Sequence, residues 1–414
     1  MTLGLTDAER AAGARLMARL DAFAAFTDEK GRLTRLFLSD AHKRAALGFI
    51  GWCAEAGLSA RIDAAGNVVA RYEGRAAGAP ALMLGSHIDT VRDAGKYDGN
   101  YGALAALAVV EDLARNGERL EHAIEIVAFG DEEGVRYRTT LSGSRALAGD
   151  YPEEELDQRD ANGVKMRDAL LAFGGDPDKA SLLRADHVAA FVEIHIEQGP
   201  VLEAEGLPIG VVSAINGATR LEIGIDGVAG HAGATPMGLR RDAFAAAAEM
   251  ALAIERRARA EADLVATVGR IDVWPGAANV IPGHAQFSLD LRAPLDAQRQ
   301  AALYDMMDGV EAIARARAVS ATIAQTHDAS AYVCDPRIVA GLTSAVESLG
   351  VPVRRLPSGA GHDTMAIGRF RPAGMLFVRC KGGVSHNPLE SITAEDCAYG
   401  FAALARFVRH FRIS

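Results

Sequence analysis

Three short apolar runs that end in polar side chains constrain the fold of this chain most strongly. ALMLGSH, AIEIVAFGDEE and AAFVEIHIEQG lie between residues 81 and 199 and alternate with stretches of helical pattern. This alternation predicts an α/β domain in which helices flank a sheet. The runs end at His87, at Glu132 with Glu133, and at His195. Because open α/β sheets bind ligands beyond the carboxyl ends of their strands, we expect these side chains to meet in one crevice.

The order of predicted strands and helices changes between residues 209 and 326. Strand patterns are followed by a helix, two strands, a second helix and a last strand, which predicts an inserted α+β domain with an antiparallel sheet and two helices. Alternation resumes afterwards and ends in a helix at the C-terminus. Since 414 residues exceed what one hydrophobic core usually supports, we expect a catalytic domain with a mixed sheet, formed by residues 1–208 and 327–414, and an inserted domain over 209–326.

The charges, the cysteines and the first residues of the chain indicate which partners and which cellular location to expect. The 54 acidic and 44 basic side chains are interspersed and give a net charge of -10, without the basic stripe that nucleic-acid binding requires. The four cysteines are scattered and form no CxxC pair, as is typical of a reducing compartment. The first 26 residues mix charges into their apolar positions, unlike a signal peptide or a membrane span. We therefore expect a cytoplasmic protein that binds neither nucleic acid nor membranes.

The segment GSHIDTVRDAGKYDGNYG is a candidate metal-binding segment. It carries His87 and Asp89 at a strand end and Asp98 in a glycine-flanked turn. In an extended strand the HxD spacing places both side chains on one face, so Asp89 can accept a hydrogen bond from His87 and fix its tautomer. Histidine and carboxylate ligands suit a borderline divalent metal, and a capped turn with a solvated histidine is the alternative interpretation.

Adjacent carboxylates at residues 131–133 form a second candidate cluster. Three carboxylates at the mouth of an apolar strand repel one another unless cations compensate them, although acidic runs are commonly solvated loops. If a metal is near, one carboxylate can bind it while its neighbour takes a proton from water. His386, in the loop after the strand MLFVRC, is a further candidate ligand. The remaining histidines in helical or polar contexts are interpreted as structural or surface residues: His42, His122, His187 and His410.

The inserted domain carries candidate substrate-binding residues. Arg292 ends the strand SLDLR, and arginine can grip a substrate carboxylate with two parallel hydrogen bonds, although an ion-paired surface arginine is the alternative. His231, in GHAGATPM, and Asn279, in AANVIPG, can donate hydrogen bonds to a developing oxyanion. Outside this domain, the stretch SGAGHD can offer backbone amides to an anion around Gly359, with His362 and Asp363 as candidates for a supporting role.

Taken together, these segments resemble the amidase, hydantoinase and carbamoylase branch of the dinuclear aminoacylase and carboxypeptidase-type metallohydrolases. The resemblance covers nearly the whole chain and rests on nine motifs in order: GRLTRLFLS, GSHIDTV, GKYDGNYG, FGDEEGVRY, EIHIEQGPVLE, GHAGATPM, NVIPG, SGAGHD and VSHNPLE. One motif departs slightly from the family pattern, because Asp131 precedes the two glutamates and Val135 stands where a small polar residue is common.

The resemblance implies two divalent metal ions, zinc or manganese with cobalt as a further option, and five ligands: His87, Asp98, Glu133, His195 and His386. It implies that Asp98 bridges the ions, that Glu132 is the general base and that Asp89 supports His87. It implies that His231 polarises the scissile carbonyl and that the substrate is bound by Asn279 and Arg292, with Gln198 and Arg220 as further candidates. It also implies a homodimer joined through the inserted domain, which acts as a lid and can complete the partner's site.

The same resemblance gives the expected reaction: hydrolysis of a linear amide or ureido carbon–nitrogen bond in a small carboxylate-bearing substrate. GRLTRLFLS and INGATR favour allantoate, converted to ureidoglycine, ammonia and carbon dioxide. The alternatives are hydrolysis of N-carbamoyl-L-amino acids, of ureidoglycolate or of β-ureidopropionate. An alternative of another class is a binding protein that keeps this fold without catalysis.

Overall fold

The computed structural model describes residues 4–413, and the chain divides into two compact units. Unit 1 comprises Met1–Ser213, Cys334–Leu356 and Gly361–Ser414, and unit 2 comprises Ala214–Val333 and Pro357–Ala360. Each unit has its own cluster of buried apolar side chains. None of the helices within residues 4–413 combines the length and the apolar composition that a membrane span needs.

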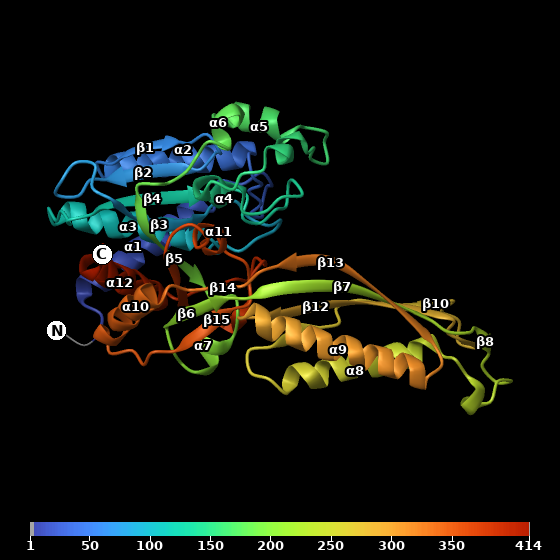
Figure 1. The fold of residues 1–414 in the computed structure, drawn as a ribbon. Helices are drawn as coiled ribbons and strands as arrows, with labels where there is room; N and C mark the ends of the chain where they lie inside the picture. The colour runs from blue at the N-terminus through green and yellow to red at the C-terminus, as the bar shows by residue number, and fades with distance from the viewer. Residues whose placement is uncertain (1–3, 414) are drawn as a thin grey trace. The chain divides into compact units, whose positions relative to one another are not determined.

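Unit 1 is built on a mixed sheet in the order β1-β2-β4-β3-β5-β16-β6, with β15 beside β6 (Figure 1). Its strands are β1 (Ser59–Ile62), β2 (Val68–Tyr72), β3 (Ala81–His87), β4 (Ala123–Phe129), β5 (Val188–Ile196), β6 (Ile209–Ile215), β15 (Arg355–Ser358) and β16 (Ala373–Val378). The central strands β4, β3, β5 and β16 run parallel to one another, whereas β1, β2 and β6 pair in antiparallel fashion. All residues of β3 and β4 are buried, which fits their largely apolar sequences. The predicted mixed sheet is confirmed.

Helices flank this sheet, as the alternating pattern predicts. They are α1 (Asp7–Phe23), α2 (Asp40–Glu55), α3 (Asn100–Arg115), α4 (Ser142–Ala148), α5 (Met166–Phe173), α6 (Pro177–Ala180), α7 (Val201–Ala204), α10 (Pro336–Ser348), α11 (Thr364–Ile367) and α12 (Ala394–His410), with short 3-10 turns η1 (Glu153–Asp157) and η3 (Lys381–Gly383). Helix α3 contacts β3, β4 and β5, and α2 contacts β1 and β2. A capping box of Thr6 and Glu9 starts α1, and Thr393 caps α12.

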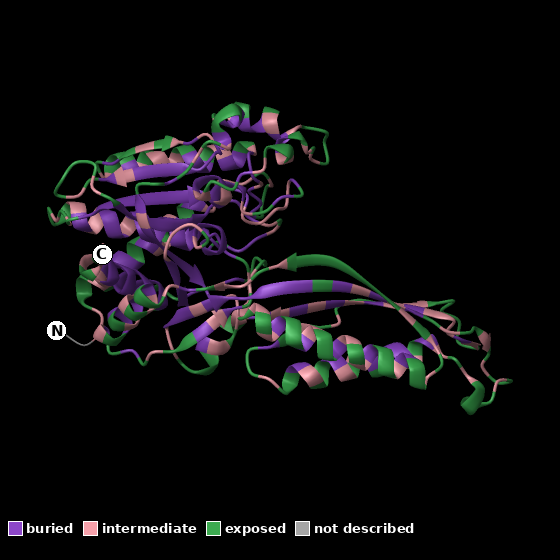
Figure 2. Cartoon of the chain, viewed as in Figure 1, coloured by how far each residue is buried: buried purple, intermediate pink, exposed green. Residues whose placement is uncertain are grey.

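Unit 2 is an antiparallel sheet with two helices on one face. Its strands have the order β10-β12-β7-β13, with β9 beside β12: β7 (Gly217–Asp226), β9 (Val265–Thr267), β10 (Ile271–Trp274), β12 (His284–Ala293) and β13 (Ser320–Ala329). Burial alternates along β12, so one face packs on α8 (Ala243–Arg259) and α9 (Asp296–Ala316), while β13 is mostly exposed (Figure 2). Shorter elements complete the unit: β8 (Gly230–His231), β11 (Val280–Ile281), β14 (Tyr332–Val333) and η2 (Met237–Leu239).

Candidate metal centre

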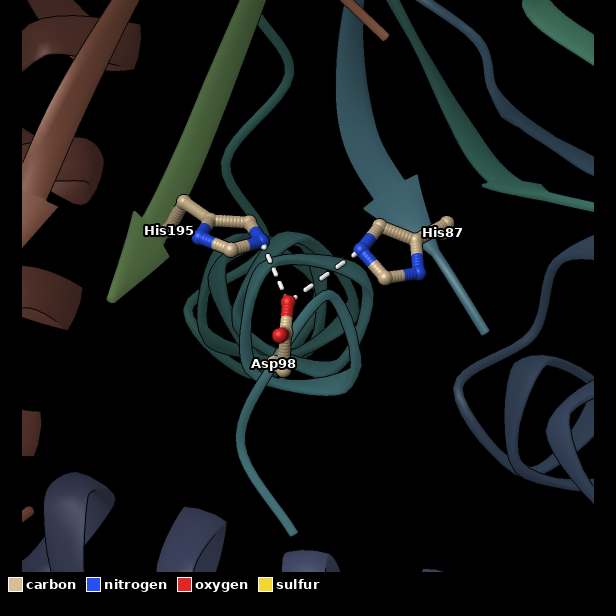
Figure 3. Close-up of side chains that lie close together, drawn as sticks. All are labelled: His87, Asp98 and His195. Carbon is tan, nitrogen blue, oxygen red and sulfur yellow. Dashed lines mark ion pairs between the residues drawn. The ribbon is translucent and has the colours of Figure 1, made fainter. Parts of the chain in front are cut away.

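The strand ends of β3 and β5 and the turn before α3 bring three side chains together. His87 is the last residue of β3, His195 lies near the end of β5, and Asp98 lies just before α3 (Figure 3). Asp98 Oδ1 is 3.1 Å from His195 Nε2 and 3.4 Å from His87 Nε2, and all three side chains are buried. The next residue, Gly99, has φ +64°, and a Cβ there would lie 2.4 Å from the His87 ring, so the turn requires glycine.

The second oxygen of Asp98 connects this group to a further histidine and a glutamate. Asp98 Oδ2 is 3.1 Å from His386 Nε2, which is 3.5 Å from Glu133 Oε2. His87 Nε2 is 3.9 Å from Glu132 Oε2. The cluster thus contains three overlapping sets of metal-binding side chains, each with donor atoms within 4.8 Å of one another, and Asp98 belongs to two of them. Imidazole and carboxylate donors in this arrangement fit zinc, manganese or cobalt. All five side chains expected to be ligands meet here.

Asp89 holds the neighbouring acidic loop through its side chain. Its carboxylate accepts the backbone N–H groups of Glu132 at 3.2 Å and Glu133 at 3.3 Å. The expected hydrogen bond between the Asp89 carboxylate and His87 is not formed, because that carboxylate is engaged with the two amides and lies 3.8 Å from His87 Nδ1. Instead, His87 Nδ1 is 3.0 Å from the Asp89 carbonyl oxygen. With its proton on Nδ1, the His87 ring would turn the lone pair of Nε2 toward the cluster, where it can bind a metal ion.

Burial and the neighbouring charges shift the pKa values of this cluster. Burial opposes ionisation of Asp98, but hydrogen bonds from His195, His386 and His87 hold its pKa well below the usual value. Burial raises the pKa of Glu132 well above its usual value, and burial with the nearby Asp98 raises that of Glu133 to about 7. A carboxylate with a raised pKa is better matched to accepting a proton near neutral pH than an ordinary glutamate.

Five of the residues expected to contact the substrate lie in two groups within unit 2. His231 ends β8 opposite Val280 of β11, and the Asn279 carbonyl accepts the N–H of the residue after His231. Arg292 of β12 donates to both carboxylate oxygens of Asp290, at 2.7 and 3.0 Å, and to the Gly359 carbonyl oxygen at 2.6 Å.

Arg220 of β7 faces Asp290 across the sheet and donates to it at 2.9 Å, so both arginines contact the same carboxylate. Gly359 contacts Arg292 through its carbonyl oxygen. The sequence instead predicts that the backbone amides of this stretch bind an anion. Gln198, in unit 1, donates from Nε2 to Asp98 Oδ2 at 2.8 Å and lies against the candidate metal centre.

Arg35, a fully buried arginine beside this centre, is a further residue that the sequence patterns do not predict. Its guanidinium donates to the carbonyl oxygens of Phe23, Phe26 and Ile88 and to Asn100 Oδ1. It therefore ties the segment after His87 to the start of α3. The one feature of the sequence that could have indicated a structural role for Arg35 is its position in GRLTRLFLS, where a charged side chain interrupts an apolar run.

His362 also lies close to the centre, with its buried ring 4.6 Å from that of His195. The sequence predicts a supporting role for His362 beside this glycine-rich stretch, but not which histidine its ring contacts.

Comparison with known proteins places this architecture in a family. The model of peptidase family M20/M25/M40 matches residues 83–410. Allantoate deiminase 1 of Glycine max is 40% identical, over 94% of this chain and 88% of the relative. The N-carbamoyl-L-amino acid amidohydrolase of Geobacillus stearothermophilus is 42% identical, over 90% of this chain and 92% of the relative.

A solved structure agrees with these relatives. The crystal structure of an amidase of the hydantoinase/carbamoylase family from Burkholderia multivorans superposes with a TM-score of 0.91 at 35% identity, covering 96% of this chain and 97% of that one. The family resemblance inferred from the motifs is confirmed. This chain belongs to the peptidase M20/M25/M40 family and is one of its amidohydrolases, which hydrolyse carbon–nitrogen bonds other than peptide bonds.

Proposed function

We propose that this chain is an allantoate amidohydrolase that uses two divalent metal ions, zinc or manganese with cobalt as a further option. One water hydrolyses the terminal ureido group of allantoate and leaves ureidoglycine, ammonia and carbon dioxide. The observation that carries the proposal is the position of Asp98, whose two oxygens lie 3.1 Å from His195 and 3.1 Å from His386. A carboxylate in that position is suited to bridge two ions. The similarity to the soybean allantoate deiminase supports the choice of substrate.

The proposed division of labour separates the two adjacent glutamates. Glu133, with His87, Asp98, His195 and His386, would hold the metals, which supply Lewis acidity that polarises a carbonyl and makes water more acidic. Glu132 would take a proton from the attacking water and return it to the leaving nitrogen. Asp89 would hold both glutamates in place through their backbone amides.

The side chains of unit 2 are proposed to bind the substrate. His231 and Asn279 would donate hydrogen bonds to the developing oxyanion, and Arg292 would bind the carboxylate, with Arg220 beside it. Gln198 and Gly359 would complete the polar contacts. We further propose that unit 2 acts as a lid and joins two copies of the chain as a homodimer, and that the enzyme is cytoplasmic.

A second candidate substrate class is the N-carbamoyl-L-amino acids. The 42% identity to the Geobacillus stearothermophilus enzyme favours this class as directly as the soybean relative favours allantoate. Both classes contain a ureido group and a carboxylate, so the same residues serve both. They differ in the group attached to the carbon beside the carboxylate, which is a second ureido group in allantoate.

The deciding experiment is a comparison of kcat/KM among these substrates. Protein freed of metal and reconstituted with Mn²⁺ or Zn²⁺ is assayed by ammonia release on allantoate, ureidoglycolate, β-ureidopropionate and a set of N-carbamoyl-L-amino acids. A preference for allantoate supports the proposal, and a preference for a carbamoyl amino acid moves the assignment to the second class. Equal activity with and without metal contradicts the metal-dependent mechanism.

A further inference from the structure

Glu390 connects the two loops that carry Asp98 and His386. One of its oxygens, Oε1, accepts the backbone N–H of Tyr97 at 2.8 Å and that of Asp98 at 3.1 Å. The other, Oε2, lies 2.9 Å from the hydroxyl of Ser385, the residue before His386. A single carboxylate therefore holds the backbone of one loop and the side chain of the other.

The fit around Glu390 is close. Glu390 is 5% exposed, so the amides that it accepts have little access to water as a replacement. A Cβ at Gly95 would lie 2.3 Å from the Glu390 side chain, so the turn that precedes Asp98 leaves room for this carboxylate only with glycine at that position. The Ser385 hydroxyl is also 3.0 Å from Asp98 Oδ2 and can donate its one proton to either carboxylate.

We infer that Glu390 is a positioning residue for the metal centre, which sets the position of Asp98 relative to His386. The inference rests on the proposed role of these two side chains as ligands. Their donor atoms lie 3.1 Å apart, and they come from segments far apart in the chain, so local backbone geometry cannot fix that distance. Loss of a group that orients a metal ligand typically weakens metal affinity about 10- to 100-fold.

Glu197 provides a matched control for Glu390. It is also a buried glutamate, 7% exposed, and it also accepts two backbone N–H groups, those of Val201 at 2.8 Å and Leu202 at 3.0 Å. Those amides lie at the start of α7 and belong to none of the proposed ligands. Replacing either glutamate by alanine removes the same kind of contact, but only the carboxylate of Glu390 binds the loops that carry Asp98 and His386.

The experiment is titration of Mn²⁺ into the metal-free full-length protein by calorimetry, with the melting temperature of each variant measured in parallel. We expect Glu390→Ala to weaken Mn²⁺ binding about 10- to 100-fold. Glu197→Ala should lower the melting temperature and leave Mn²⁺ affinity within about threefold of wild type. Glu390→Gln, which keeps the length of the side chain and an oxygen acceptor, should bind Mn²⁺ more tightly than Glu390→Ala.

Equal Mn²⁺ affinity in Glu390→Ala and Glu197→Ala would overturn the inference and leave Glu390 with a purely structural role. If Glu390→Ala does not fold, Gly95→Ala tests the same contact by displacing the Glu390 side chain, and unchanged Mn²⁺ affinity in that variant would also overturn it. A wild-type protein that binds no Mn²⁺ and no Zn²⁺ would instead contradict the metal centre itself. The two failures are therefore distinguishable.

Discussion

Replacing Arg292 by alanine tests whether this arginine binds the substrate carboxylate. Of the five N–H donors of a guanidinium, three are used in the bonds to Asp290 and Gly359, which leaves two for a ligand. Asp290 on one side and Gly359 on the other restrict the orientation of the group, so it is preorganised for a carboxylate.

The expected size of the effect follows from these two donors. A hydrogen bond to a charged group contributes about 1.5–3 kcal/mol, and the lower figure applies because the Arg292 side chain is 30% exposed. Two such bonds give about 3 kcal/mol, and since each 1.4 kcal/mol is about tenfold, kcat/KM should fall roughly a hundredfold.

The assay compares an N-carbamoyl amino acid with its neutral carboxamide, by ammonia release. Arg292→Ala should lose roughly a hundredfold in kcat/KM on the acid and much less on the amide. Arg270→Ala is the control, because Arg270 is an ion-paired arginine of the same unit, paired with Glu222, and carries no proposed role. Equal losses on the acid and the amide would refute the reasoning and leave Arg292 as a structural partner of Asp290.

Three further predictions test the base, the assembly and the core. Glu132→Gln should keep its bound metal, measured by elemental analysis, while kcat falls about 10²- to 10⁴-fold, and loss of the metal would instead make Glu132 a ligand. Light scattering should report a dimer, and full activity of a dilute monomer would contradict a site shared between subunits. Gly85→Ala should lower the melting temperature, because the added Cβ would lie 1.9 Å from the Val127 carbonyl oxygen in the adjacent strand. Gly51→Ala should raise the melting temperature slightly, because Gly51 lies in helix α2 and its added Cβ would have no atom within 4 Å. Melting curves that show equal shifts for the two glycines would contradict this packing argument.

The contacts of the Asp89 carboxylate could not be predicted from strand periodicity. The HxD spacing predicts a shared face only while the backbone stays extended, but β3 ends at His87, so Asp89 lies beyond the strand. Its carboxylate therefore turns to the amides of Glu132 and Glu133, which are contributed by a different strand end. A sequence pattern cannot predict such a contact, because it depends on which strands are neighbours in the sheet.

The partners of two other buried charged residues could not be predicted from the sequence either. Arg35 and Glu390 each have a recognisable place in a motif, yet their partners lie on segments remote in sequence. Buried charged groups need partners, so their presence predicts a polar contact without saying which one. For Asp290, the sequence predicts only a strand residue two positions before Arg292, and not the residues that its carboxylate contacts.

The sequence by itself determined the classes of element and the chemistry of the site. Short, largely apolar runs that alternate with helical patterns predict a sheet flanked by helices, and the order of strand and helix patterns between residues 209 and 326 predicts an inserted domain with an antiparallel sheet. The polar residues at the strand ends predict a metal-binding crevice. These features are local, because burial and side-chain direction follow from the period of the chain. Only the tertiary structure decided that Asp98 lies between three histidines and that Glu390 joins two ligand loops. The distance between donor atoms on different loops is set by packing in three dimensions.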